Sequence, residues 1–138
     1  MPDVTAQLSN PQVIEIWVNG PDGANRMFVC SGFLASPWGG WQAGNAQMRE
    51  TFTFHVGPPL AVREFIRACC AVGPIGISAN NNPAAQGGAL IRSSDADWDD
   101  EDGRVQVTVE VEADGPWMLS GFHYNVTILA EQAEQQPQ

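Results

Sequence analysis

Alternation of apolar and polar residues is the main pattern along this chain, and it is clearest in residues 104–112. There, valines at every second position alternate with polar residues. A period of two places one set of side chains on a buried face and the other in water. The same alternation recurs in residues 51–56 and 122–128. The sequence therefore predicts three β-strands, each with one apolar face.

Less regular strand signals occupy much of the remaining chain. Residues 12–18, 27–34 and 89–93 have strand-like composition, and Ile75 and Ile77 indicate a short additional strand.

Turn signals separate these runs. Glycine, asparagine, aspartate and proline cluster in residues 19–23, 102–103 and 114–116. We expect the first and last of these clusters to close antiparallel hairpins.

Residues 60–72 are the segment with a helical pattern. The preceding Gly57-Pro58-Pro59 favours a helix start. A strand would place Glu64 among apolar side chains, so we predict a short helix. The apolar stripe of that helix contains Val62, Phe65, Ile66, Cys69 and Val72, opposite Arg63, Glu64 and Arg67.

The chain length and these elements together define an expected fold class. A chain of 138 residues has the usual size of one domain and can bury a substantial core. We expect a mainly β protein, an antiparallel β-sandwich or jelly-roll-like single domain over residues 1–138, with at most one short helix. Polar flexible tails are expected at residues 1–10 and 131–138.

Charge narrows the classes of partner. The chain carries 16 acidic and 6 basic residues, all arginine, for a formal net charge of −10. Nucleic acids and anionic membranes attract clustered cations, so neither is an expected partner. The absence of lysine excludes a lysine-containing phosphate loop and Schiff-base chemistry.

No secretion signal or membrane span is evident from the sequence. The first ten residues lack a positive start and an apolar run, and no segment approaches 18 continuous apolar residues. We therefore expect a soluble protein without membrane insertion, in the cytoplasm or within an assembled particle.

An acidic run precedes the clearest strand and offers candidate metal ligands. Its carboxylates could hold Ca²⁺, which takes several oxygen ligands, although the spacing does not fit an EF-hand. The alternative is a solvated, self-repelling turn. No cofactor other than Ca²⁺ is expected. The candidate ligands are Asp95, Asp97, Asp99, Asp100 and Asp102.

Five tryptophans in so short a chain are a second functional signal. Trp38 and Trp41 flank two glycines in a loop-like stretch, and Trp98 lies inside the acidic run. Indole rings on loops are suitable platforms for sugars or for another protein surface. Trp17 and Trp117 are interpreted as core or sheet-face packing.

Polar groups on strand faces complete the set of candidate site residues. His55, and His123 together with Asn125, lie on the polar faces of two predicted strands and would form one patch if those strands share a sheet. Cys69 or Cys70 could act as a nucleophile beside such a histidine. The three cysteines are expected to be free thiols, and no catalytic residue is assigned.

Three functional hypotheses follow. The first is a non-catalytic binding module that recognises a glycan or a protein surface through its loop tryptophans and acidic loop. The alternative is a structural subunit that forms homo-oligomers or decorates a larger particle such as a virion. The third is a small hydrolase-type enzyme.

Overall fold

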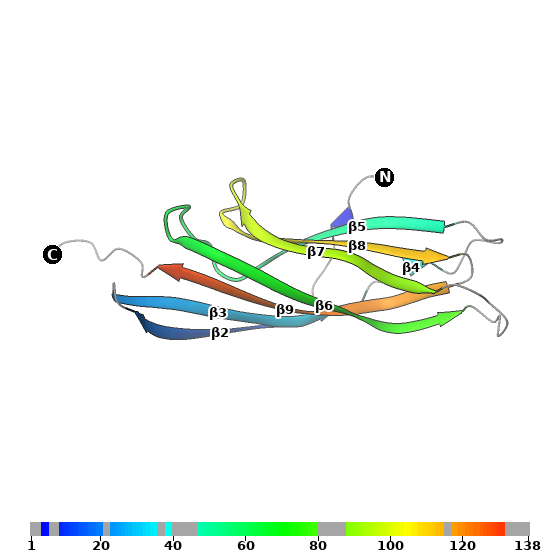
Figure 1. Cartoon of the computed structure of the whole chain (residues 1–138), viewed down its shortest axis with the longest axis horizontal. Helices are drawn as coiled ribbons and strands as arrows, with labels where there is room; N and C mark the ends of the chain where they lie inside the picture. The colour runs from blue at the N-terminus through cyan, green and yellow to red at the C-terminus, as the bar shows by residue number, and fades with distance from the viewer. Residues whose placement is uncertain are drawn as a thin grey trace.

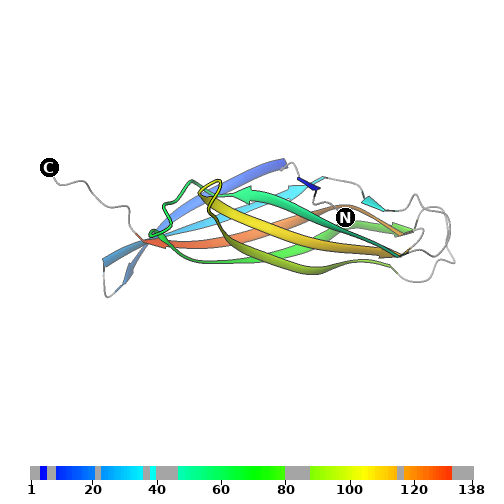
Figure 2. The ribbon, with the colours of Figure 1, turned by 90° about the horizontal axis from the view of Figure 1, so that it is seen from above.

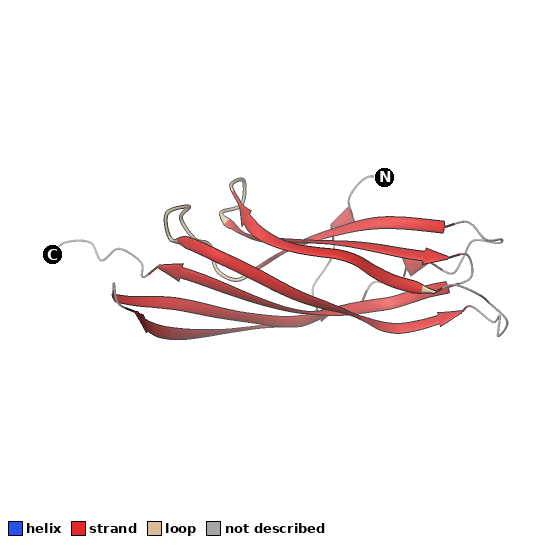
Figure 3. Ribbon diagram, viewed as in Figure 1, coloured by secondary structure: helices blue, strands red, loops and turns tan. Residues whose placement is uncertain are grey.

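The computed structural model describes residues 4–5, 9–20, 23–35, 38–39, 47–79, 88–114 and 117–131. Every regular element in these ranges is a β-strand, as Figure 3 shows. The mainly β fold class is therefore confirmed. The strands are β1 (Val4–Thr5), β2 (Ser9–Gly20), β3 (Gly23–Leu34), β4 (Trp38–Gly39), β5 (Gln47–Val56), β6 (Phe65–Ala79), β7 (Ala89–Asp99), β8 (Arg104–Asp114) and β9 (Trp117–Glu131).

The strands form two stacked sheets (Figure 1). One is a four-stranded sheet in the order β1-β5-β8-β7. In the five-stranded sheet β2 pairs with β3, β3 pairs with β9, and β4 and β6 also pair with β9. All of these pairings are antiparallel except that of β1 with β5. The architecture is an antiparallel β-sandwich.

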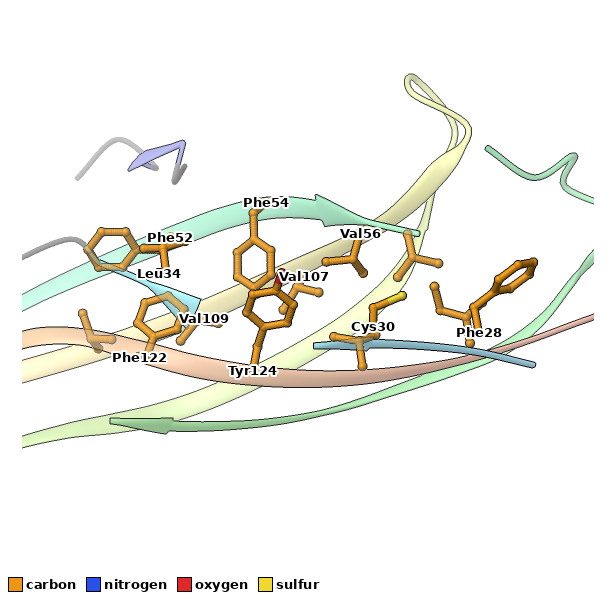
Figure 4. Packing of buried hydrophobic residues seen from close by; sticks show 14 of the residues in the cluster. Phe28, Cys30, Leu34, Phe52, Phe54, Val56, Val107, Val109, Phe122 and Tyr124 are labelled. Atoms are coloured by element: carbon orange, nitrogen blue, oxygen red, sulfur yellow. The ribbon is translucent and has the colours of Figure 1, made fainter. Parts of the chain in front are cut away.

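Apolar side chains from the facing sides of the two sheets fill the space between them (Figure 4). Phe52 and Phe54 of β5 pack against Phe122 and Tyr124 of β9, with ring centroids 5.0 to 6.2 Å apart. The four alternating valines of β8 are completely buried beside them. Burial of apolar surface contributes roughly 25 cal/mol per Å², so this layer is the main stabilising feature of the fold.

The alternation in the three clearest strands is confirmed because each has one face on this core. Phe52 lies opposite Val109, and Phe54 lies opposite Val107, so the apolar faces of β5 and β8 coincide. The polar residues between them point away from the core.

The prediction of a helix over residues 60–72 is wrong. Residues 61–64 form a turn in which the Glu64 N–H donates to the Ala61 carbonyl at 2.9 Å, and β6 begins at Phe65. The Glu64 carboxylate lies outside the strand and accepts hydrogen bonds from the Ala61 N–H and from Arg26, both at 2.8 Å. Pairing of β6 with β9 along most of its length outweighs the local helical pattern.

The acidic run expected to form a loop belongs mostly to β7, which ends at Asp99. A register shift between Ile91 and Ser93 changes which residues face inward. Ile91 packs on the core before the shift, and Ala96 and Trp98 pack on it afterwards. Asp95, Asp97 and Asp99 occupy the alternate positions after the shift and therefore point outward.

One of the two expected hairpins is confirmed and the other is wrong. Gly20 pairs with Gly23, so β2 and β3 form a hairpin. β8 and β9 lie in different sheets, so the chain crosses between the layers from Asp114 to Trp117. A hairpin forms instead between β7 and β8, where Gly103 adopts a φ of 66° that favours glycine.

The two sides of the sandwich differ. On one side β6 and β7 contact each other across the layers, whereas on the other side β2 extends beyond β5, as seen from above in Figure 2. β2 thus forms a free edge of the five-stranded sheet, with β3 as its strand neighbour.

Parts of the predicted tails are strands: β1 and the first residues of β2 fall within 1–10, and Glu131 ends β9. The predicted tail residues 1–3, 6–8 and 132–138 lie outside the described residues. Within the part of the chain that is described, no helix is long and apolar enough to cross a membrane.

Candidate functional site

A polar cluster lies at the end of the four-stranded sheet where β5 finishes. His55 points outward there because its neighbours Phe54 and Val56 both point into the core. In the register of the sheet, His55 lies opposite Gln106 of β8, which in turn lies opposite Asp97 of β7. The pairing of three strands therefore brings a histidine of β5 close to the acidic end of β7.

Asp99 and Asp102 join His55 through the β7–β8 turn. Asp99 is the last residue of β7, and its carbonyl accepts a 2.8 Å hydrogen bond from the Gly103 N–H. The Gly103 carbonyl accepts a 2.7 Å hydrogen bond from the Leu60 N–H. These main-chain bonds hold the turn, with the Asp102 side chain, against the end of β5.

The three side chains form a compact group. His55 Nε2 lies 2.8 Å from Asp99 Oδ2 and 3.0 Å from Asp102 Oδ2. The other oxygen of Asp99 accepts a 3.1 Å hydrogen bond from the Glu101 N–H. The hydrogen bond from His55, followed by that from Glu101, holds the pKa of the Asp99 carboxyl below its ordinary value. Asp99 is thus a carboxylate at neutral pH.

The structure divides the predicted calcium ligands. Asp99 and Asp102 converge, with His55, to place three ligand atoms within 4.8 Å of one another. Asp95 lies farther along β7, opposite Thr108, and the Asp97 carboxylate accepts a hydrogen bond from the Trp98 N–H. Sequence reasoning assigned His55 and the aspartates to separate groups, because only the strand pairing shows that they meet.

Trp98 faces the interior rather than the acidic surface. Its ring is half-buried against the core, and its indole N–H donates to the Leu60 carbonyl at 3.0 Å. Trp38 lies in β4, but the structure describes only its backbone. Trp41 lies outside the described residues. Glycan binding through these rings stays a prediction.

The two histidines do not share a patch, because β5 and β9 belong to different sheets. His123 and Asn125 are exposed on the outer face of the five-stranded sheet. Cys69 lies opposite Thr127 on that face, four residues along β9 from His123. Four residues of strand span about 13 Å, too far for a cysteine and a histidine to exchange a proton directly.

All three cysteines are free thiols, as expected. Burial raises the pKa of Cys30 to about 11. The pKa of Cys70 is also raised, mainly by burial. Neither group is a thiolate at neutral pH, which is the form required of a nucleophile.

Exposed apolar residues on β2 are a feature that sequence reasoning missed. Trp17 was expected to pack on a sheet face or in the core, but it is 56% exposed. Val13 is 51%, Ile14 57% and Ile16 44% exposed. Val13 and Trp17 lie opposite Cys30 and Arg26 on the inner face of the sheet, and Ile14 and Ile16 lie on its outer face. Both faces of this edge strand therefore carry exposed apolar side chains, with Glu15 between Val13 and Trp17 on the inner face.

The outer faces of the two sheets contrast strongly. Beside Ile14 and Ile16, partly exposed Met27, Val29 and Leu129 continue the apolar row across β3 and β9. The outer face of the four-stranded sheet carries an ion-pair network instead. In this network Glu112 bridges Arg49 at 3.3 Å and Arg92 at 3.1 Å, and Arg92 also contacts Glu110 at 3.3 Å.

The fold and its surface define a class of molecule: a two-layer antiparallel β-sandwich with an ion-pair network on one outer face, an apolar row on the other, and an edge strand, β2, that carries exposed apolar side chains. No protein-family model, curated protein or solved structure matches the chain.

The molecule has two separate surfaces with unusual side chains. The cluster of His55, Asp99 and Asp102 lies on the four-stranded sheet, and the exposed apolar side chains of β2 lie on the five-stranded sheet. These two surfaces are formed by different sheets, so each can be altered without changing the other.

Proposed function

We propose that the protein is a structural subunit whose copies associate edge to edge through β2. The observation that supports this proposal is the exposure of large apolar side chains on both faces of a free edge strand. An exposed edge offers unpaired main-chain groups as well as side chains, so it favours pairing with another strand. The proposal corresponds to the self-assembling alternative among the hypotheses drawn from the sequence.

A second copy of β2 is the partner that best fits this edge. In an antiparallel pair related by a two-fold axis at Ile16, Ile16 lies opposite its counterpart and Ile14 lies opposite Val18. Both contacts join aliphatic side chains on the outer face. On the inner face the same register sets Glu15 opposite Trp17. Such cross-strand pairs are the unit of sheet stabilisation.

This register is more favourable than the two neighbouring registers. Centring the pair on Glu15 would set two carboxylates side by side, which is destabilising. Centring it on Ile14 would place Pro11, which has no N–H to donate, inside the paired segment. A two-fold axis at Ile16 pairs residues 12–20 and leaves Pro11 outside.

Charge favours β2 as the meeting point of two acidic chains. The chain carries a net charge of −10, so most of its surface repels a second copy. β2 contains a single charged residue, Glu15, among its twelve. Two copies therefore meet with little charge repulsion along this strand.

The substitution Ile16→Lys is expected to convert the self-associated protein into a monomer. It sets two ammonium groups opposite each other and removes two isoleucines from the contact, at a combined cost of roughly 3 kcal/mol. That cost raises the dimer Kd about 100-fold. Sedimentation velocity from low micromolar to near-millimolar concentration measures the change.

Val62→Lys is the matched control, since Val62 is exposed in the turn before β6 and receives the same new charge. This variant should associate like the unsubstituted chain. The proposal would be contradicted by an unsubstituted chain that stays monomeric over the whole range, or by equal effects of the two substitutions.

A further inference from the structure

We infer that His55, Asp99 and Asp102 form a binding site for a divalent transition-metal ion, of which Zn²⁺ is the representative. The site lies on the outer face of the four-stranded sheet and is independent of the proposed association through β2. The donor set decides the class of ion. One imidazole nitrogen and two carboxylate oxygens suit Zn²⁺, whereas Ca²⁺ takes six to eight oxygen ligands and no nitrogen.

Two of the three distances between donor atoms are close to those of a metal coordination shell. Ligands about 2.0–2.2 Å from an ion, separated by 90–109°, lie roughly 3.0–3.5 Å from one another. His55 Nε2 is already 2.8 Å from Asp99 Oδ2 and 3.0 Å from Asp102 Oδ2. All three ligand atoms lie within 4.8 Å of one another, so closure of the exposed Asp102 carboxylate brings the set around one ion.

Two of the ligands are held in place and the third can adjust. His55 and Asp99 belong to paired strands, and their side chains are 24% and 15% exposed. The hydrogen bond from the Glu101 N–H fixes the second oxygen of Asp99, as outer-shell partners do in metal sites. Asp102 is 54% exposed in the turn, so its carboxylate can close on the ion.

The charge of the group favours a divalent cation over a proton. A protonated His55 carries one positive charge, which balances only one of the two carboxylates. A divalent ion balances both and leaves the imidazole neutral, which is the form that ligates metals. Three protein ligands leave a fourth position for water.

Isothermal titration of the chelator-treated full-length chain with Zn²⁺ and, separately, Ca²⁺ tests the inference. One Zn²⁺ is expected per chain, with Ca²⁺ binding at least tenfold more weakly. His55→Gln and Asp102→Asn each remove a ligand and should weaken Zn²⁺ binding at least tenfold, since loss of even an outer-shell partner typically costs 10- to 100-fold. Circular dichroism of each variant confirms that the sandwich is intact.

Two control variants separate this site from other sources of affinity. His123→Gln removes the other histidine, and Asp97→Asn removes a carboxylate from the same face of β7; both should keep the Zn²⁺ affinity within threefold. Co²⁺ bound to the unsubstituted chain should give the visible absorption of a nitrogen- and oxygen-ligated ion, lost in His55→Gln. The inference is overturned by an absence of saturable Zn²⁺ binding, by Ca²⁺ binding as tightly as Zn²⁺, or by equal losses in Asp97→Asn and Asp102→Asn.

Discussion

Replacing Phe122 with alanine is expected to lower the free energy of unfolding by about 4 kcal/mol, the usual cost of removing a buried phenyl ring. The Phe122 ring lies at the centre of the core, 5.8 Å from the Phe52 ring in an edge-to-face arrangement and 6.2 Å from that of Phe54. Domains of this size have a total stability of about 5–15 kcal/mol. The loss is therefore a large fraction of what holds the two sheets together.

Urea unfolding followed by tryptophan fluorescence measures this loss, at one fixed protein concentration because association is linked to stability. Phe33→Ala is the matched control. Phe33 lies on the outer face of the same sheet, beside the pair formed by Leu34 and Phe122, and is 36% exposed. Its replacement should cost less than about 1 kcal/mol. Similar losses in both variants would mean that Phe122 does not lie at the centre of the core.

The substitution Gly121→Ala is expected to destabilise the sandwich by about 3 kcal/mol, at the upper end of the cost of overpacking. A Cβ atom at Gly121 would overlap the Leu34 carbonyl oxygen and lie 3.2 Å from the Ala35 Cα. These are main-chain atoms, so they cannot turn aside as the end of a side chain can. β9 would have to separate from β3 where β3 ends.

Gly88→Ala is the control for added volume, because a Cβ atom there meets no atom within 4 Å. Its urea midpoint should be unchanged or slightly higher, since alanine reduces the entropy of the unfolded chain. Equal midpoints for the two variants would show that β9 and β3 are not in close contact at Gly121.

The sequence predicted best those strands whose two faces have different surroundings. β8 alternates between buried and partly exposed residues from Arg104 to Val111 because the core lies on one side of it; Glu112, which follows, is also buried, where it pairs with Arg49 and Arg92. In β7 the register shift at Arg92 interrupts the alternation, so the sequence suggested a strand of five residues followed by a loop. A bulge depends on the partner strand and leaves little trace in the sequence of one strand.

The errors at β6 and β2 have a different physical cause. The sequence that forms the start of β6 does have a helical pattern of apolar residues. Pairing with β9 stabilises the strand more than local propensity stabilises a helix. At β2, Trp17 was assigned to core or sheet-face packing because it lies in a strand-like run of the sequence. Its exposure follows from β2 extending beyond β5 on that side of the sandwich (Figure 2), and the placement of one sheet over the other is not encoded in any single strand.

Only the two carboxylates of the candidate metal centre could be predicted from the sequence. Asp99 and Asp102 were included among the predicted cation ligands, since carboxylates crowded in sequence also lie close in space. His55 is 44 residues from Asp99 and reaches it only through the order β5-β8-β7. The prediction of Ca²⁺ followed from carboxylates alone, and the nearby imidazole changes the inferred ion to Zn²⁺.

Cross-linking at Ile16 tests the central claim, that two copies pair through β2, most directly. Directly opposite residues in an antiparallel pair have Cα atoms about 4.5–5.5 Å apart, within disulfide range. Ile16→Cys, with the exposed Cys69 replaced by serine, should therefore form a covalent dimer on mild oxidation. Ile14→Cys in the same background should stay monomeric, because the two new thiols would lie four residues apart. Monomers from both variants, or equal cross-linking of both, would contradict the pairing of two chains about Ile16.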